Sequence, residues 1–162
     1  MIDVQFTDNS AKVLEALHAA CERGLEEIGQ TAEKYAVVKT PVDTGNLRNS
    51  MTHAVHGETV YIGSNTSYAT YVEWGTGRFA TNGNGRKGWW VYVAGSDKAT
   101  VNPVKKIYTY EEARKIMAIL RKKGLDAHMT EGMQPAHMIR DSVADHAAEY
   151  RQIMIRALSE MQ

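Results

Sequence analysis

Two short stretches of the sequence hold residues whose types and spacing could support chemistry. The first is TPVDTGNLRNS, from Thr40 to Ser50, and the second is SYATYVEWGTG, from Ser67 to Gly77. A carboxylate in either stretch could act as a general acid or base. A lone carboxylate beside an arginine is more often a structural ion pair, and we predict such a pair between Glu73 and Arg48. The two stretches therefore favour a structural role over catalysis.

No further motif in the sequence supports a catalytic function or a metal-binding site. The chain has no G-x-S-x-G sequence, and the stretch GNGRKG at 83–88 lacks the Gly-Lys-Ser/Thr ending of a phosphate-binding loop. The six histidines have no cysteine or carboxylate at a recognised metal-ligand spacing, and His53 and His56 would face opposite sides of a strand. We therefore expect no metal site and no cofactor.

Each stretch has a sequence that can fix a local backbone shape. Pro41 restricts the chain, Asp43 or Thr44 can accept hydrogen bonds from the amides of a new helical turn, and Leu47 is expected in the core. In the second stretch glycines 75 and 77 permit a sharp reversal. Its apolar anchors fall at helix-like steps: Tyr68, Tyr71, Val72 and Trp74.

Long helices are predicted at both ends of the chain. From Ser10 to Lys39 apolar residues recur every three or four positions, Asp8 to Ser10 offer N-cap oxygens, and Pro41 disfavours helical geometry at Thr40. The same spacing recurs after Pro135. The two apolar stripes suit packing of the helices against each other at a shallow angle.

Strands are predicted between these helices. Residues 51–65 form a hairpin about a Gly57-Glu58 turn, and residues 89–95 form a further strand. The glycine-rich segment 77–88 between them is expected to be a mobile loop. Residues 101–131 read as an inserted strand–helix–strand unit, with a capping box at Thr109 and Glu112 and a C-terminal cap at Gly124.

These elements predict an α+β fold: a small antiparallel sheet packed by the long N- and C-terminal helices, with the inserted strand–helix–strand unit at one end. We predict a single domain over residues 1–162, with residues 101–131 as a subunit within it. A length of 162 residues suits one modest core.

Composition narrows the class of protein. Lysine plus arginine equals aspartate plus glutamate at 19 each, which disfavours a free-standing nucleic-acid binder, although a local basic patch can hide inside a neutral total. The single Cys21 cannot form an internal disulfide and is expected to act as a small apolar residue on a helix. The sequence predicts no signal peptide and no membrane span, so we expect a soluble protein made in a cytoplasm.

The two stretches resemble the motifs of a family of small tail-component or head–tail joining proteins from tailed bacteriophages and prophages, also called neck or tail-completion proteins. The first motif is matched by Pro41, Asp43, Thr44, Gly45, Leu47 and Ser50. The second motif is matched by Tyr68, Ala69, Tyr71, Glu73, Trp74, Gly75 and Thr76. A late element, QPAHMIRDS, also resembles the family, with His137 where a phenylalanine is usual. The resemblance covers residues 10–80 and 133–160, and residues 101–131 lie outside the commonest form of the family.

The resemblance implies a structural subunit and not an enzyme. Relatives form a ring, commonly of six copies, between the tail tube or tail terminator and the head connector, so the implied partners are further copies and these proteins. The implied location is the bacterial host's cytoplasm during assembly and then the neck or tail of the virion. Loops facing the lumen of such a ring would meet passing DNA, so Arg78, Arg86 and Lys87 are expected to contact phosphates without regard to sequence.

Two other classes of function stay open at this point. The inserted unit also resembles small peptidoglycan-binding repeats, so the chain could be a non-catalytic module that recognises cell-wall glycan or a protein partner. An enzyme, for example a hydrolase that uses Glu73 or Asp43, is the third reading.

Overall fold

The computed structural model describes residues 8–95 and 107–161, which fall into two compact units. The helical unit consists of Met1–Thr66 with Met138–Gln162, and the central unit consists of Ser67–His137. The residue range of the central unit includes the segment 101–131 that the sequence predicts as an insertion. The prediction of one domain over the whole chain stays a prediction.

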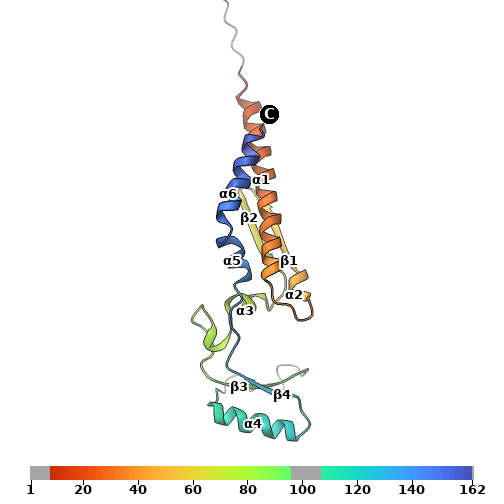
Figure 1. The fold of residues 1–162 in the computed structure, drawn as a ribbon, viewed down its shortest axis with the longest axis vertical. Helices are drawn as coiled ribbons and strands as arrows, with labels where there is room; N and C mark the ends of the chain where they lie inside the picture. Colours follow the sequence, from red (N-terminus) through yellow and green to blue (C-terminus); the bar gives the residue numbers. More distant parts are fainter. Residues whose placement is uncertain (1–7, 96–106, 162) are drawn as a thin grey trace, which may run out of the picture. The chain divides into compact units, whose positions relative to one another are not determined.

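Helix α1 (Ser10–Lys39) forms the long axis of the helical unit and has the predicted bounds (Figure 1). At its start the Asp8 carboxylate accepts a hydrogen bond from the amide of Ser10 at 2.9 Å. At its end Thr40 takes an extended backbone, as a residue before proline should. Its buried face is made of small residues, which let neighbouring elements approach closely: Ala20, Gly24, Gly29, Ala32 and Ala36.

One side of α1 packs against a two-stranded antiparallel hairpin. Strands β1 (Met51–His56) and β2 (Thr59–Ser64) pair from Met51 opposite Ser64 to His56 opposite Thr59, which confirms the predicted hairpin. Gly57 opens the turn with φ of 58°, a backbone conformation that glycine adopts without strain. The turn and the alternation of buried side chains together fix this register.

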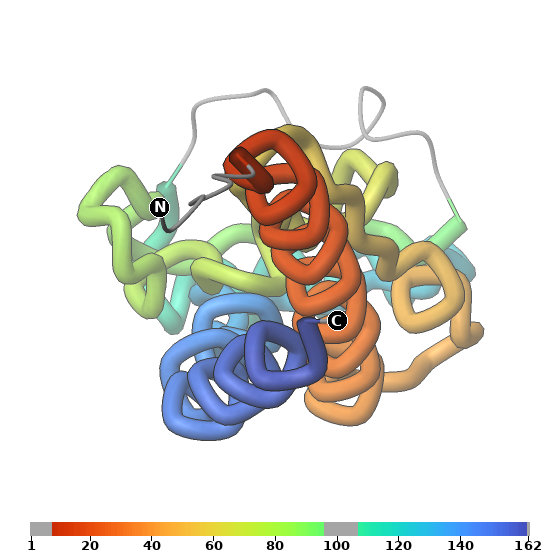
Figure 2. Tube along the Cα trace, turned by 90° about the horizontal axis from the view of Figure 1, so that it is seen from above, coloured from red at the N-terminus to blue at the C-terminus, as the bar shows by residue number. Residues whose placement is uncertain are grey.

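The C-terminal part of the chain returns along α1 as two helices, α5 (Met138–Ala144) and α6 (Ala147–Ser159) (Figures 1 and 2). The sequence predicts one helix here, so the break at Asp145 and His146 is a difference. The Tyr150 hydroxyl donates to the carbonyl of Ser142 at 2.6 Å, and the His146 ring stacks on Tyr35 of α1 with ring centroids 3.4 Å apart. These contacts hold the break in place.

The central unit begins with two short helical segments, α3 (Ala69–Trp74) and the 3₁₀ turn η1 (Gly77–Phe79). Strand β3 (Trp90–Val93) then pairs antiparallel with β4 (Ala127–Thr130), Trp90 opposite Thr130 and Val93 opposite Ala127. Helix α4 (Tyr110–Lys122) covers one face of this pair (Figure 1).

Helix α4 has the ends that the sequence predicts. The Thr109 side chain accepts from the amide of Glu112, and the Glu112 carboxylate accepts from the amide of Thr109, so the capping box is present. Gly124 has φ of 78° just past the helix. The core beneath the helix contains Val91, Val93, Ala113 and Ala127, with Ile116, Met117 and Leu120 packed against it.

The fold is α+β, as predicted, although the strands form two separate two-stranded sheets in the described residues. The partner of β4 is β3, which precedes the predicted insertion. The first strand of the predicted strand–helix–strand unit falls at residues 104–108, of which 104–106 lie outside the described part. Tyr108 forms an isolated bridge with Trp89. Among the described residues no helix has the length and apolar character to cross a membrane.

Candidate assembly site

The first predicted stretch, residues 40–50, forms a tight turn that leads into strand β1. Pro41 and Asp43 are exposed, and the Thr44 hydroxyl accepts from the amide of Asn46 at a long 3.5 Å. Gly45 has φ of 84° immediately before the single helical turn α2 (Asn46–Asn49). Leu47 on this turn is buried, as predicted, while Arg48 is exposed.

The last residue of this stretch ties the turn to the hairpin. The Ser50 hydroxyl donates to the carbonyl of Leu47 at 2.7 Å and lies 2.6 Å from the hydroxyl of Ser64. The Ser64 hydroxyl is in turn 2.9 Å from that of Thr66 and accepts from the Thr66 amide. A short chain of hydroxyls therefore fixes the turn against the end of β2, which is a structural arrangement.

The second stretch, residues 67–77, is a short helix with an aromatic exposed side. Tyr68, Tyr71 and Trp74, three residues apart, are 38%, 60% and 39% exposed. Ala69 and Glu73 are buried on the other side. The apolar residues of this stretch therefore lie for the most part at the surface, while Glu73 is in the interior.

The glycines of this stretch lie directly against the segment that returns to the helical unit's α5. The amide of Thr76 donates to the carbonyl of Met133 at 2.9 Å, and the amide of Arg78 donates to that of Glu131 at 3.0 Å. Gly75 and Gly77 are buried with φ of 75° and 61°, as the predicted reversal requires. A Cβ atom at either glycine would overlap backbone atoms of residues 131–135.

The return segment also carries His137, the residue that departs from the family's pattern. Its amide donates to the carbonyl of Glu73 at 3.2 Å, and its ring meets the Trp74 ring edge-on at 6.1 Å. Its φ of 48° is left-handed, which is uncommon for a residue with a side chain. The first part of the late element, up to His137, is therefore packed against the second motif within the central unit.

The predicted pair between Arg48 and Glu73 would join the two units, and it stays a prediction. Of the three predicted DNA contacts, Arg78 pairs with the Glu131 carboxylate at 2.9 Å. The Arg86 guanidinium lies over the Trp90 ring, 4.9 Å from its centroid, and Lys87 is exposed. Their role toward DNA also stays a prediction.

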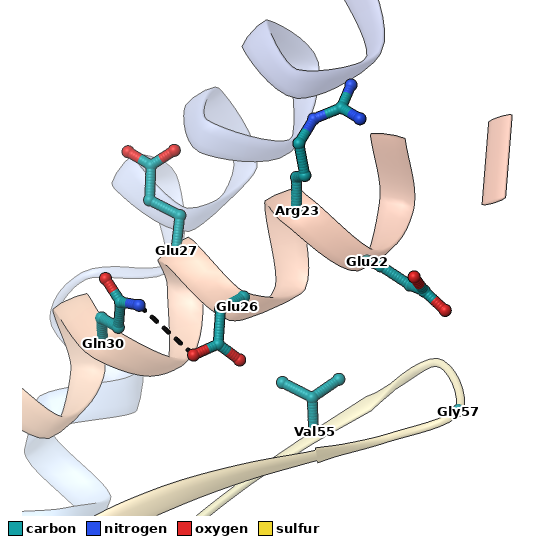
Figure 3. Close-up of a pocket in the computed structure, with 7 residues that line it drawn as sticks. All are labelled: Glu22, Arg23, Glu26, Glu27, Gln30, Val55 and Gly57. Atoms are coloured by element: carbon teal, nitrogen blue, oxygen red, sulfur yellow. Dashed lines mark hydrogen bonds between the residues drawn. The ribbon is translucent and has the colours of Figure 1, made fainter. Parts of the chain in front are cut away.

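The helical unit has an open hollow of about 560 Å³ between α1 and the hairpin turn (Figure 3). Glu26 points toward Val55 of β1, while Arg23 and Glu27 lie on the other side of the helix. Glu26 accepts from Gln30 at 3.2 Å, and Glu27 pairs with Arg156 of α6. Two of the three glutamates that line the hollow, Glu26 and Glu27, are therefore engaged in structural contacts. The described residues hold no group of side chains that could bind a metal ion.

Beside this hollow the His53 imidazole joins α1 to β1. Its Nδ1 atom lies 2.6 Å from the Glu33 carboxylate, its Nε2 atom lies 3.1 Å from Glu26, and its amide donates to Glu33 at 3.0 Å. The hydrogen bond to Glu33 raises the pKa of His53, with a smaller contribution from Glu26, although burial acts in the opposite direction. The ring packs so closely on Gly29 that a Cβ atom there would overlap it.

This arrangement predicts a pH-dependent stability. The pKa of His53 is raised in the folded state because its protonated ring interacts with Glu33 and Glu26. The stability that this interaction contributes is therefore fully present below the unfolded pKa of about 6.5, and it is lost as pH rises through the folded value. We expect the free energy of unfolding, measured in urea by circular dichroism, to fall across that window. The variant His53→Gln should show a flatter profile, while His18→Gln, at an exposed site on α1, should retain the slope. An equal slope in His53→Gln would contradict the assignment.

Sequence reasoning missed two features that depend on contacts between distant residues. The first is the contact of the His53 imidazole with two glutamates of α1, Glu26 and Glu33. The second is the face of β3 and β4 opposite α4, where Tyr92 stacks on His128 with ring centroids 5.4 Å apart. Only the alternation of aromatic residues in WWVYV could have indicated that face.

The charges divide unequally between the two units. Counted over the sequence, the central unit has eleven lysine and arginine residues against six acidic ones, and the helical unit has eight against thirteen. The zero net charge of the chain therefore conceals a basic unit and an acidic unit. The neutral total charge allowed for a local excess of basic residues, and this excess lies in the central unit.

Part of the chain is similar to a known protein family. A family model described as "HK97-gp10_like: Bacteriophage HK97-gp10, putative tail-component" matches residues 5–75. The matched part includes α1, the first motif, the hairpin and nearly all of the second motif. No curated protein and no solved structure gives a significant match. Over residues 5–75 the chain is therefore similar to a family of phage tail components, which confirms the resemblance that its two motifs indicate.

Proposed function

We propose that this protein completes the phage tail or joins it to the head connector, as a ring of identical copies. The observation that carries the proposal is the family match over residues 5–75, which indicates a structural tail protein. The motifs support it because their residues stabilise turns: Ser50 and Leu47 fix the first, and buried glycines fix the second. On this proposal the protein is not an enzyme.

The charge division supports association of copies. An acidic helical unit on one copy can face a basic central unit on the next. Such a head-to-tail contact forms a closed ring when the rotation from one copy to the next divides a full turn evenly. The exposed aromatic side chains of α3 offer apolar area for contacts with a neighbouring copy or another tail protein. Sedimentation of the purified chain as a monomer at all concentrations would argue against a ring in solution.

The remaining parts of the proposal concern partners and location. The ring would contact the tail tube or tail terminator on one side and the head connector on the other. Arg78, Arg86 and Lys87 would contact the phosphates of passing DNA, with Arg78 partly neutralised by Glu131. Assembly would take place in the cytoplasm of the bacterial host, and the mature protein would reside in the virion.

The test is electron microscopy of lysates from the source phage or prophage after deletion of the gene. We expect DNA-filled heads lying apart from tails, or tails of abnormal length, because the junction would be incomplete. Expression of the chain from a plasmid should restore whole particles. Intact, infectious particles from the deletion strain would contradict the joining and completing roles.

A further inference from the structure

The sheet of the central unit has one face that α4 does not cover. Side chains alternate along a strand, so Val91 and Val93 of β3 point toward α4 and lie in its core. Trp90 and Tyr92 must therefore lie on the opposite face, together with His128 of β4, which pairs with Tyr92 across the sheet. We call Arg86, Trp90, Tyr92 and His128 the aromatic face.

The four side chains of the aromatic face end in planar groups, of which Arg86 and Trp90 are half-buried. The Tyr92 and His128 rings are stacked with an angle of 24° between their planes. The Arg86 guanidinium lies over the Trp90 ring at 4.9 Å. Tyr92 is 44% exposed and the His128 side chain is 40% exposed, so a planar ligand could reach both. The Asp126 carboxylate, 2.9 Å from Nε2 of His128, orients that ring.

The electrostatic setting of this face favours a polyanion. Arg86 belongs to the face, Lys87 is exposed beside it in sequence, and the unit as a whole has an excess of basic residues. A neutral sugar could stack on the same rings but would gain nothing from this charge. A duplex could use the cations, but its bases are hidden in the helical stack and would not reach the rings. An unpaired nucleic-acid strand uses both features.

We propose that the aromatic face binds single-stranded nucleic acid without sequence preference, with bases stacking on Tyr92, His128 and the Arg86–Trp90 pair. Phosphates would contact Arg86 and Lys87. Aromatic residues on a sheet next to cations form the usual platform for unpaired bases, since every base has a π face. This inference does not depend on the joining role, and a chain without that role could still bind a single strand.

The test is fluorescence anisotropy of a labelled oligothymidylate of about 20 nucleotides titrated with the full-length chain. We expect binding that weakens with salt, and quenching of tryptophan fluorescence, since Trp90 lies in the face. Tyr92→Ala and Arg86→Ala should each weaken binding by about tenfold, in keeping with the loss of one stacking contact. Tyr92 and Arg86 are not in the core, so their variants should fold, which far-ultraviolet circular dichroism would check.

Matched controls lie in the helical unit. Tyr61→Ala removes a strand tyrosine that is 57% exposed, and Arg151→Ala removes an exposed arginine of α6, so neither should change the affinity. Equal binding of a duplex of the same length, with no effect of Tyr92→Ala, would overturn the proposal in favour of charge alone. Binding of chito-oligosaccharides in place of the oligonucleotide would overturn it in favour of a carbohydrate site.

Discussion

Replacing Gly77 with alanine is expected to lower the free energy of unfolding of the central unit by about 3 kcal/mol. Two costs add at this position. The φ of 61° disfavours any residue with a Cβ atom, and that atom would overlap the carbonyl oxygen of Glu131. The backbone would have to move away, and the hydrogen bond from Arg78 to Glu131 would be lost.

Tryptophan fluorescence in urea would measure this effect selectively. All three tryptophans, Trp74, Trp89 and Trp90, belong to the central unit. The control is Gly57→Ala, because Gly57 has a similar φ of 58° but no atom within 4 Å of the added Cβ. That variant should lose only about 1 kcal/mol, in the helical unit, and leave the fluorescence transition unchanged. Equal effects of the two substitutions would show that overlap at Gly77 is relieved without cost.

Replacing Met138 with alanine is expected to destabilise the helical unit by about 3 kcal/mol. Met138 is 0% exposed and is the largest fully buried side chain among the described residues. Its sulfur lies 3.5 Å from the Thr40 hydroxyl, which itself donates to the carbonyl of Ala36 at 2.6 Å. The alanine would therefore leave a cavity where α5 begins, beside the end of α1.

Far-ultraviolet circular dichroism in urea would follow this loss, since most of the helix belongs to α1, α5 and α6. Met138→Leu conserves volume and should cost less than about 1.5 kcal/mol. Met161→Ala, at a position 36% exposed, should change stability by less than about 0.5 kcal/mol. A cost for Met138→Ala no greater than that for Met161→Ala would contradict the packing described.

The elements that the sequence predicts well are those with local causes. The bounds of α1 follow from its apolar spacing and from Pro41, and the α4 cap follows from Thr109 and Glu112. The break between α5 and α6 could not be predicted, because it depends on stacking of His146 against Tyr35, more than a hundred positions away. The spacing of apolar residues continues through the break and conceals it.

The candidate site also has parts that the sequence predicts from local residues and parts that depend on distant contacts. The turn at residues 40–50 follows from its own residues, and the left-handed glycines of residues 67–77 are recognisable as a reversal. What these glycines pack against is set by the segment 131–137, which no local pattern connects to them. The aromatic face requires the pairing of Tyr92 with His128, which depends on a register that the sequence alone does not give.

The backbone contact between Arg78 and Glu131 has a consequence for how chains of this kind can change in length. The polypeptide leaves the second motif and returns at adjacent points, so everything between forms a loop that is closed at its base. Because the entropy of closing a loop grows only with the logarithm of its length, that loop can be shortened, extended or exchanged at small thermodynamic cost. The motif segment would keep its shape throughout, so new binding properties could be acquired there without rebuilding the remainder of the protein.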